Sequence, residues 1–218
     1  MSRTLALTCA VALGATPALA QTWSAAPTAA DMAAAYPEKV RTRGVGGGVE
    51  LVCTAGREGR LEDCAVLGES PRGLGFGVAA RRLAESKLRT AGHAKGAEVR
   101  VPVTFPAELV SGGGFTAKTP VWAALPSVTD LQSAVPKTEG GPNNIRVTLF
   151  CDVQAGGTLS ACVVDREDPA GHGFGLAILA LAPKFQVALM SAEGMPTVGG
   201  KVRVPVRFDL KPAEQAAK

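Results

Sequence analysis

The sequence predicts an α+β fold: two tandem small domains, each ordered helix, strand, strand, helix, strand, with a three-stranded antiparallel sheet. The first observation behind this prediction is a repeated pair of cysteines. Cys53 and Cys64 are eleven residues apart, as are Cys151 and Cys162, and the two pairs have a constant offset (151 − 53 and 162 − 64 both equal 98). The second observation is that segments of helical and strand periodicity recur in the same order around both pairs.

The first half of each copy contains a helix and a hairpin. A short Ala-rich helix is expected near 28–36 and near 128–135. Two strands follow, near 49–54 and 61–67 in the first copy and near 145–153 and 159–164 in the second. Between them lie Glu58-Gly59 and Gly156-Gly157, which predict tight turns because glycine accepts positive φ without a steric cost.

The second half of each copy contains a helix and a closing strand. Apolar residues at helical spacing predict the helix: Phe76, Ala80, Leu83 and, roughly, Leu88, then Phe174, Ile178, Leu181 and Phe185. Strict alternation predicts the strand: Val99, Val101, Val103 and Phe105, then Val202, Val204, Val206 and Phe208. Pro102 and Pro205 lie inside these strands, and proline cannot donate a ladder hydrogen bond. Each closing strand is therefore expected at a sheet edge.

The turn positions place the two cysteines of each copy opposite one another across its hairpin, at a separation that a disulfide can bridge. We therefore expect disulfides between Cys53 and Cys64 and between Cys151 and Cys162. Closing a loop of this size contributes about 3 kcal/mol in the chain-entropy model. A redox role is not favoured, because the spacing is far from Cys-x-x-Cys.

The first twenty residues predict export. One positive charge at Arg3, an apolar run over 4–13 and Ala18-Leu19-Ala20 are typical of a cleavable signal peptide; an uncleaved anchor is the alternative. Cleavage also removes Cys9 and leaves an even number of cysteines, as expected for a periplasmic or secreted protein. The predicted organisation is signal peptide 1–20, first domain 21–110, linker 111–119, second domain 120–212 and tail 213–218. Small insertions raise the repeat offset near the closing strand, and we expect them in surface loops.

Several function classes are not expected. Without Arg3 the chain has 22 basic and 19 acidic residues, a net charge of +3 with both signs scattered, so no nucleic-acid partner is predicted. No later segment predicts a membrane span. The Gly-x-Gly-x-x-Gly fingerprint fails at Val78 and Leu176, and no metal or cofactor is predicted. Glu69 and Glu167 recur, but helix capping is favoured over catalysis; His172 has no counterpart in the first copy, and no enzyme is predicted.

The repeat resembles a known family. Tyr36-Pro37, the glycines at 46–48, Gly77-Val-Ala79 and the strand Val-Arg-Val-Pro-Val-Thr-Phe at 99–105 are similar to the C-terminal periplasmic domain of TonB energy transducers. The second copy carries Gly175-Leu-Ala177 and Val-Arg-Val-Pro-Val-Arg-Phe at 202–208. The resemblance covers nearly all of the expected mature chain. Energy transduction is not carried over, because the chain has no Pro-rich spacer and its signal is expected to be cleaved.

The resemblance implies binding by strand addition, in which an extended segment of an envelope protein pairs with the edge of each closing strand. The expected function is thus a non-enzymatic protein- or peptide-binding module, with a link to TonB-type envelope transport. The residues expected to form these edges are those of the alternating pattern: Val99, Val101, Val103, Phe105, Val202, Val204, Val206 and Phe208. Alternatively, proline, arginine or docking on the other copy blocks each edge. An envelope scaffold or dimerisation module is the second hypothesis, a hydrolase the third, and the oligomeric state stays open.

Overall fold

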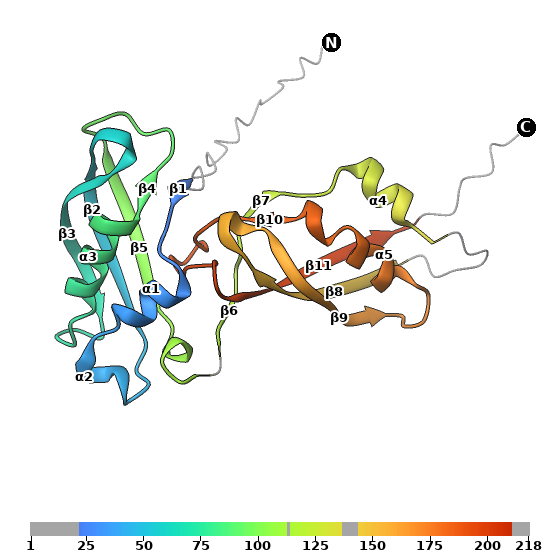
Figure 1. Ribbon diagram of the computed structural model, residues 1–218, viewed down its shortest axis with the longest axis horizontal. Helices are drawn as coiled ribbons and strands as arrows, with labels where there is room; N and C mark the ends of the chain where they lie inside the picture. Colours follow the sequence, from blue (N-terminus) through green and yellow to red (C-terminus); the bar gives the residue numbers. More distant parts are fainter. Residues whose placement is uncertain (1–21, 113, 137–143, 211–218) are drawn as a thin grey trace, which may run out of the picture.

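The computed structural model describes residues 22–112, 114–136 and 144–210 (Figure 1). The predicted signal peptide and tail lie outside the described residues, as does residue 113 of the predicted linker. The elements of the first copy are β1 (Trp23–Ala25), α1 (Ala29–Ala34), α2 (Glu38–Arg41), β2 (Gly47–Ala55), η1 (Arg57–Gly59), β3 (Leu61–Ser70), α3 (Phe76–Lys87), β4 (Arg89–Thr90), β5 (Glu98–Phe105) and η2 (Ala107–Leu109). Those of the second are β6 (Thr116–Ala117), β7 (Trp122–Ala124), α4 (Val128–Ala134), β8 (Asn144–Val153), η3 (Ala155–Gly157), β9 (Leu159–Asp168), α5 (Phe174–Ala180), η4 (Ala182–Lys184), β10 (Gln186–Val187) and β11 (Lys201–Asp209).

The α+β prediction is confirmed. The first copy forms an antiparallel sheet in the order β3-β2-β5, and the second forms a sheet in the order β6-β11-β8-β9. Short ribbons pair β1 with β4 and β7 with β10. Figure 1 shows α3 and α5 lying along their own sheets, with the strands of the two copies running in different directions.

The second sheet differs from the prediction, because it has a fourth strand. β6 pairs with β11 in parallel, through Thr116 opposite Lys201 and Ala117 opposite Val202. These residues belong to the segment predicted as a linker. Phe115 and Ala117 are buried in the core of the second copy, at 4% and 2% exposure. Burial of these apolar side chains gives the segment a fixed course along β11.

The two hairpins share their irregularities as well as their strands. Each has one register shift beside the cysteines and a second one further along. At the first shift, Asp63 and Ala161 take positive φ at equivalent positions. These β-bulges keep the cysteines opposite each other despite the longer turn. Disulfides join Cys53 to Cys64 and Cys151 to Cys162, with a Cα–Cα distance of 4.0 Å in each, which confirms the predicted pairing.

Each copy also begins its helical layer with the same cap. Thr28 and Asp31 form a capping box at the start of α1, and Ser127 and Asp130 form one at the start of α4. An ion pair with Lys87, together with the cap, lowers the pKa of Asp31 to about 2. Lys184 and Ser127 lower the pKa of Asp130 to about 2 in the same way.

Each copy has its own hydrophobic core beneath its sheet. In the first, Tyr36, Phe76 and Phe105 pack together with ring centroids 5.3–5.8 Å apart. In the second, Phe174 packs on Phe208 at 5.2 Å. The predicted helical face from Phe174 to Phe185 is only partly realised. α5 ends at Ala180, and Pro183 places the following residues in η4, because proline cannot continue an α-helix.

One insertion has an unexpected place. Residues 188–200 connect β10 to β11, where the first copy uses only 91–97 between β4 and β5. We call residues 188–200 the insertion loop. The prediction of an exposed surface loop is wrong here, because five of its side chains are buried: Met190 at 3%, Ser191 at 5%, Met195 at 7%, Thr197 at 0%, and Pro196. Met190 packs in the core of the first copy. The longer connection therefore joins the two copies.

Candidate functional site

The candidate site consists of the edges of the two closing strands, β5 and β11. Seven of the eight residues predicted there point their side chains into the cores: Val99, Val101, Val103, Phe105, Val202, Val204 and Phe208 are at most 7% exposed, and Val206 is half-buried. By the alternation of main-chain groups, the N–H and C=O groups at these positions face the neighbouring strand, β2 or β8. The eight predicted residues therefore offer a partner neither outward main-chain groups nor, with the partial exception of Val206, exposed side chains. The residues between them direct their side chains to the open face of each sheet, so they determine what a partner meets there.

The outward main chain of β5 belongs to the even-numbered residues. The amide of Thr104 donates to the carbonyl of Gly194, and N–H groups point alternately to the two sides of a strand. The amides of Arg100 and Glu98 therefore face outward too. Pro102, in the same register, has no N–H group to offer. The outward side of β5 therefore has only three main-chain N–H donors, those of Glu98, Arg100 and Thr104.

The insertion loop occupies the C-terminal part of this edge. Thr104 donates its amide to Gly194 O at 2.9 Å and its hydroxyl to Glu193 O at 2.6 Å. Gly194 lies so close to the strand that a Cβ atom there would be 2.0 Å from Pro102 O. A hydrogen bond from Thr119 lowers the pKa of Glu193. The sequence left open that docking on the other copy blocks each closing strand. For β5 this holds in the C-terminal half of the strand, at Pro102 and Thr104.

The edge of β11 is covered only at its start. Lys201 donates its amide to Phe115 O at 2.9 Å, and β6 pairs with Lys201 and Val202. From Arg203 to Asp209, no described strand pairs with this side of β11. By alternation, Arg203 and Arg207 offer outward amides there, with Pro205 between them.

The open face beside this edge is rich in arginine. Arg203 pairs with Asp165 at 3.2 Å and lies over the ring of Phe150, 5.1 Å from its centroid. Arg207 pairs with Asp209 at 3.1 Å and stands directly opposite Arg146 on β8. Like charges opposite one another on a sheet repel, so a carboxylate brought beside them would be favoured.

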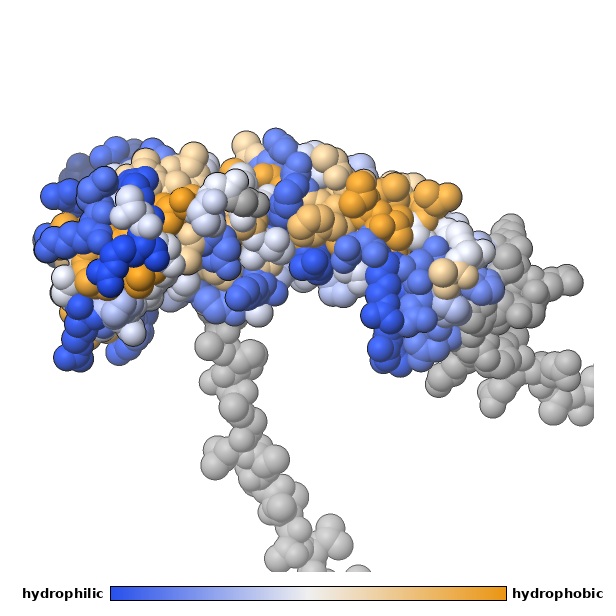
Figure 2. Space-filling view, turned by 90° about the horizontal axis from the view of Figure 1, so that it is seen from below, coloured by the Kyte–Doolittle hydropathy of each residue, from blue (hydrophilic) through white to orange (hydrophobic). Residues whose placement is uncertain are grey.

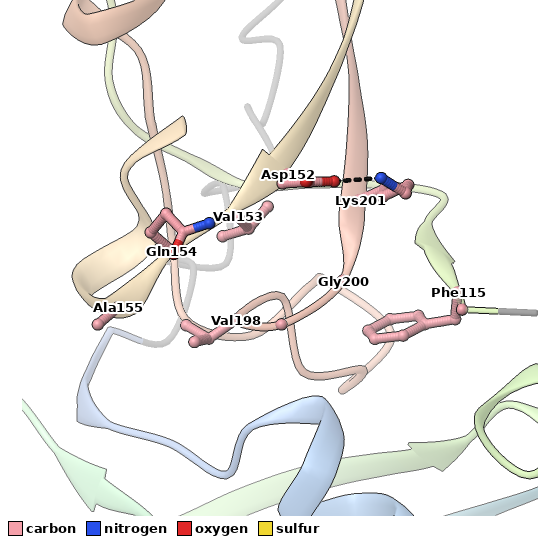
Figure 3. Close-up of a pocket in the computed structure, with 10 residues that line it drawn as sticks. Phe115, Asp152, Val153, Gln154, Ala155, Val198, Gly200 and Lys201 are labelled. Atoms are coloured by element: carbon pink, nitrogen blue, oxygen red, sulfur yellow. Dashed lines mark hydrogen bonds and ion pairs between the residues drawn. The ribbon is translucent and has the colours of Figure 1, made fainter. Parts of the chain in front are cut away.

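Two cavities flank the junction of the copies. One, of about 390 Å³, is lined by the end of β8 and by the residues before β11 (Figure 3). Its two charged side chains, Asp152 and Lys201, pair with each other, while Phe115 and Val198 line the opposite side. The other, of about 370 Å³, lies between Thr104 on β5 and Glu193 and Met195 of the insertion loop. Neither holds a cluster of three metal-ligating side chains among the described residues.

The recurring glutamates differ between the copies. Glu167 Oε1 accepts the backbone amides of His172 and Phe174, at 3.2 and 3.0 Å, so it fixes the turn into α5 as the capping prediction requires. Glu69 has a buried Oε1 without a hydrogen-bond partner in the described chain. Among the described residues, no side chain is hydrogen-bonded to Glu69 or Glu167, so neither carboxylate has a partner for acid–base catalysis there.

The exposed apolar side chains form a second repeated surface. Val66 and Val78 of the first copy recur as Val164 and Leu176, on the outer strand and the helix of each copy. The space-filling view shows a broad apolar area over the second copy (Figure 2). The remaining exposed large apolar residues in the described part of the chain are Leu67, Leu125, Val128 and Val163. We define the surface of Val66, Val78, Val164 and Leu176 as the repeated apolar strip.

Sequence reasoning missed the residues that close the β5 edge. Thr104 and Gly194 are far apart in the chain, and the recurring motif that contains Thr104 gives no sign that Gly194 lies beside it. The available signal was the change in repeat offset between β10 and β11, which marks the insertion loop. Its length shows that something was added, but its contacts depend on how the two copies pack.

The comparisons with known proteins give one relative and no family model. The scan against protein-family models found no match. A protein of Caulobacter vibrioides, described as an uncharacterized protein, is 33% identical over 91 residues. The match spans 42% of this chain and 90% of that relative. The relative is therefore about as long as one copy. Among the described residues, no helix is long and apolar enough to cross a membrane.

Proposed function

Because this chain belongs to the same family as the uncharacterized protein of Caulobacter vibrioides, which has about the length of one copy, we propose that the copy is the functional unit. The protein binds an extended segment of another protein by strand addition and has no catalytic role of its own. Its partner is an envelope protein, and its compartment is the periplasm or the exterior.

The unpaired edge of β11 from Arg203 to Asp209 carries this proposal. An extended segment laid there gains main-chain hydrogen bonds from the amides of Arg203 and Arg207 and to the outward carbonyls. Pro205 interrupts the donors but leaves its carbonyl free. Seven residues of edge are enough for a short peptide, which is the scale on which strand addition operates.

The side chains favour a segment that carries acidic residues. The open face beside the edge carries four arginines and three aspartates, so their charges cancel only in part: Arg146, Arg166, Arg203 and Arg207, with Asp165, Asp168 and Asp209. A carboxylate placed between Arg146 and Arg207 would relieve their repulsion. Arginine also forms bidentate bonds with carboxylates. The recognised segment is thus extended and acidic.

The location rests on the disulfides and on the resemblance to TonB C-terminal domains. Disulfides persist in oxidising compartments, so the two disulfides support a location outside the cytosol. The order helix, hairpin, helix, closing strand and the Val-x-Val-Pro-Val-x-Phe pattern support a relationship to the periplasmic domains of that family. A role beside envelope transport follows from that resemblance alone.

Substitution of Arg207 separates main-chain from side-chain binding. Arg207→Pro removes the outward amide in the middle of the free edge, whereas Arg207→Ala keeps the amide and removes only the charge. Proline is already tolerated two residues earlier, so both variants should fold; circular dichroism checks this. The mature protein and both variants serve as baits for an envelope extract.

The expected result is that wild type captures a partner, Arg207→Ala retains part of it and Arg207→Pro loses it. NMR titration with a peptide from the captured protein should then shift the amides of residues 203–209. If folded Arg207→Pro captures the partner as well as Arg207→Ala does, strand addition on β11 is refuted.

The repeated apolar strip favours self-association as a second candidate function. Its four side chains lie on edge strands β3 and β9 and on the helices beside them, where a second molecule could bury them. Light scattering on the mature protein and on Leu176→Glu tests this. A strict monomer over the whole concentration range would exclude the scaffold reading.

A further inference from the structure

The insertion loop contains a turn that is held by its own hydrogen bonds. Ser191 accepts the amide of Gly194 at 3.0 Å with its carbonyl and that of Met195 at 3.1 Å with its hydroxyl. The amide of Ser191 returns a bond to Met195 O at 2.8 Å, and its hydroxyl donates to Glu193. Four local bonds thus hold residues 191–195 in one turn. All four bonds lie within the insertion loop, so none of them requires a residue of the first copy.

This turn presents two adjacent carbonyls to one residue of β5. Gly194 O receives the amide of Thr104 and Glu193 O receives its hydroxyl. An added strand would supply its carbonyl to the same amide. The turn therefore accepts the Thr104 amide as the carbonyl of a bound peptide would, although the turn is a loop and not a strand.

Two further contacts fix the turn in place. Met190 is 3% exposed and packs in the core of the first copy, next to the start of the turn. At the other end of the insertion loop, Val198 O accepts the amide of Ala29 at the beginning of α1, at 2.8 Å. The loop is thus anchored on the first copy on both sides of Gly194.

We propose that the insertion loop is an internal occupant of the first copy's edge, which closes β5 to partners and couples the two copies. Of the four outward residues of β5, Thr104 is bonded and Pro102 has no amide and lies against Gly194. Arg100 and Glu98 remain, which is too short a stretch for strand addition. The consequence that, of the two closing strands, only β11 keeps an accessible edge rests on the proposed function; the closure itself does not.

Gly194 gives a direct test, because a side chain there cannot fit. Its φ is +75°, and a Cβ atom would overlap Pro102 O at 2.0 Å. Gly194→Val must therefore move the turn away from β5. Gly171→Val is the matched control: its φ is +83°, also left-handed, but nothing lies within 4 Å of its Cβ position. Both variants meet the same kind of backbone strain, and only one meets the strand.

Amide hydrogen exchange of the mature protein, read by NMR, reports the closure. The amide of Thr104 should be protected in wild type, and its exchange should rise roughly tenfold or more in Gly194→Val. It should stay near the wild-type rate in Gly171→Val. The amide of Arg100, in the same register without a described partner, should exchange fast in all three proteins. A Thr104 amide that exchanges as fast as Arg100 in wild type, or that is unaffected by Gly194→Val, overturns the proposal.

Coupling has its own readout. ¹⁵N relaxation should give one rotational correlation time for both copies in wild type and in Gly171→Val, and two different times in Gly194→Val. Separate tumbling of the copies in wild type would contradict the coupling. If Gly194→Val does not fold, Thr104→Val serves instead, since it keeps the amide and loses the hydroxyl bond to Glu193 O; Thr104 exchange should then rise by about threefold.

These results do not depend on any partner. Failure of the proposed function appears as equal capture by Arg207→Pro and Arg207→Ala, with exchange at Thr104 unaltered. Failure of the present proposal appears in the exchange and relaxation data while capture on β11 continues.

Discussion

Removal of each disulfide should destabilise the protein by an amount that differs between the copies. The change is Cys53→Ala with Cys64→Ala in one variant, and Cys151→Ala with Cys162→Ala in the other. Each bond closes a loop with a sequence separation of 11. The chain-entropy model then gives about 3 kcal/mol for either one, through the freedom returned to the unfolded chain.

Burial adds to this value in the first copy. Cys53 and Cys64 are 2% and 6% exposed, whereas in the second copy Cys151 is buried and Cys162 only half-buried. Replacing a fully buried sulfur by hydrogen loses contacts comparable to those of a methylene group, about 1 kcal/mol. The two pairs differ only in Cys64 against the half-buried Cys162, so the first pair should cost about 0.5 kcal/mol more than the second. The comparison uses two equivalent hairpins in one molecule, so differences in turn and register largely cancel.

Urea unfolding followed by tryptophan fluorescence measures both losses. Each copy contains one tryptophan, Trp23 or Trp122, so Trp23→Phe and Trp122→Phe backgrounds report the copies separately. With an m-value of about 1.5 kcal/mol/M, a loss of 3 kcal/mol lowers the midpoint by about 2 M. An unchanged midpoint would refute the loop-closure argument. Equal losses in the two copies would refute the burial argument and leave the entropic part standing.

Three other predictions concern single positions. Gly157→Ala should destabilise the second copy by more than 2 kcal/mol in chemical denaturation, because its Cβ would lie 2.0 Å from a main-chain oxygen of β10; Gly156→Ala, also at positive φ but in open space, should cost about 1 kcal/mol. Asp31 has a pKa lowered to about 2, chiefly by Lys87, so its ion pair adds stability above about pH 4 that is lost as the pH falls through 2; Lys87→Met should flatten the acid side of a pH–stability profile. Met190→Ala, although in the second half of the chain, should lower the stability of the first copy by about 2–3 kcal/mol in the tryptophan-resolved assay, and loss confined to the second copy would contradict its placement.

The features that the sequence predicted well are those set by nearby residues. Alternation in 99–105 and 202–208 follows from the geometry of a strand, and the cysteine pairing follows from the position of the turn. The same local reasoning located proline-bearing strands at or near sheet edges. It also assigned Glu167 to a cap, because a carboxylate before a helix start has free amides close at hand.

The features that it missed depend on residues far apart in the chain. Phe115 was assigned to a flexible linker because glycines precede it, yet the core of the second copy buries it. Met190 has no periodic partner, so nothing local indicated that it fills the core of the other copy. Which segment covers a sheet edge likewise depends on how distant parts of the chain pack, and the hydrophobic periodicity of the strand does not predict this.

The two copies differ in the connection before the closing strand, which is the long insertion loop in the second copy and the short segment 91–97 in the first, so they cannot replace one another. A duplication first yields two equal sheets and two equal edges, each a hazard for aggregation. Here the second copy covers part of the first, through a loop that the first copy does not have. A gene that encoded the two copies in reverse order, or the first one alone, would lose this cover and leave the pocket for Met190 empty. The order of the copies therefore has a structural consequence even though their strands are nearly alike.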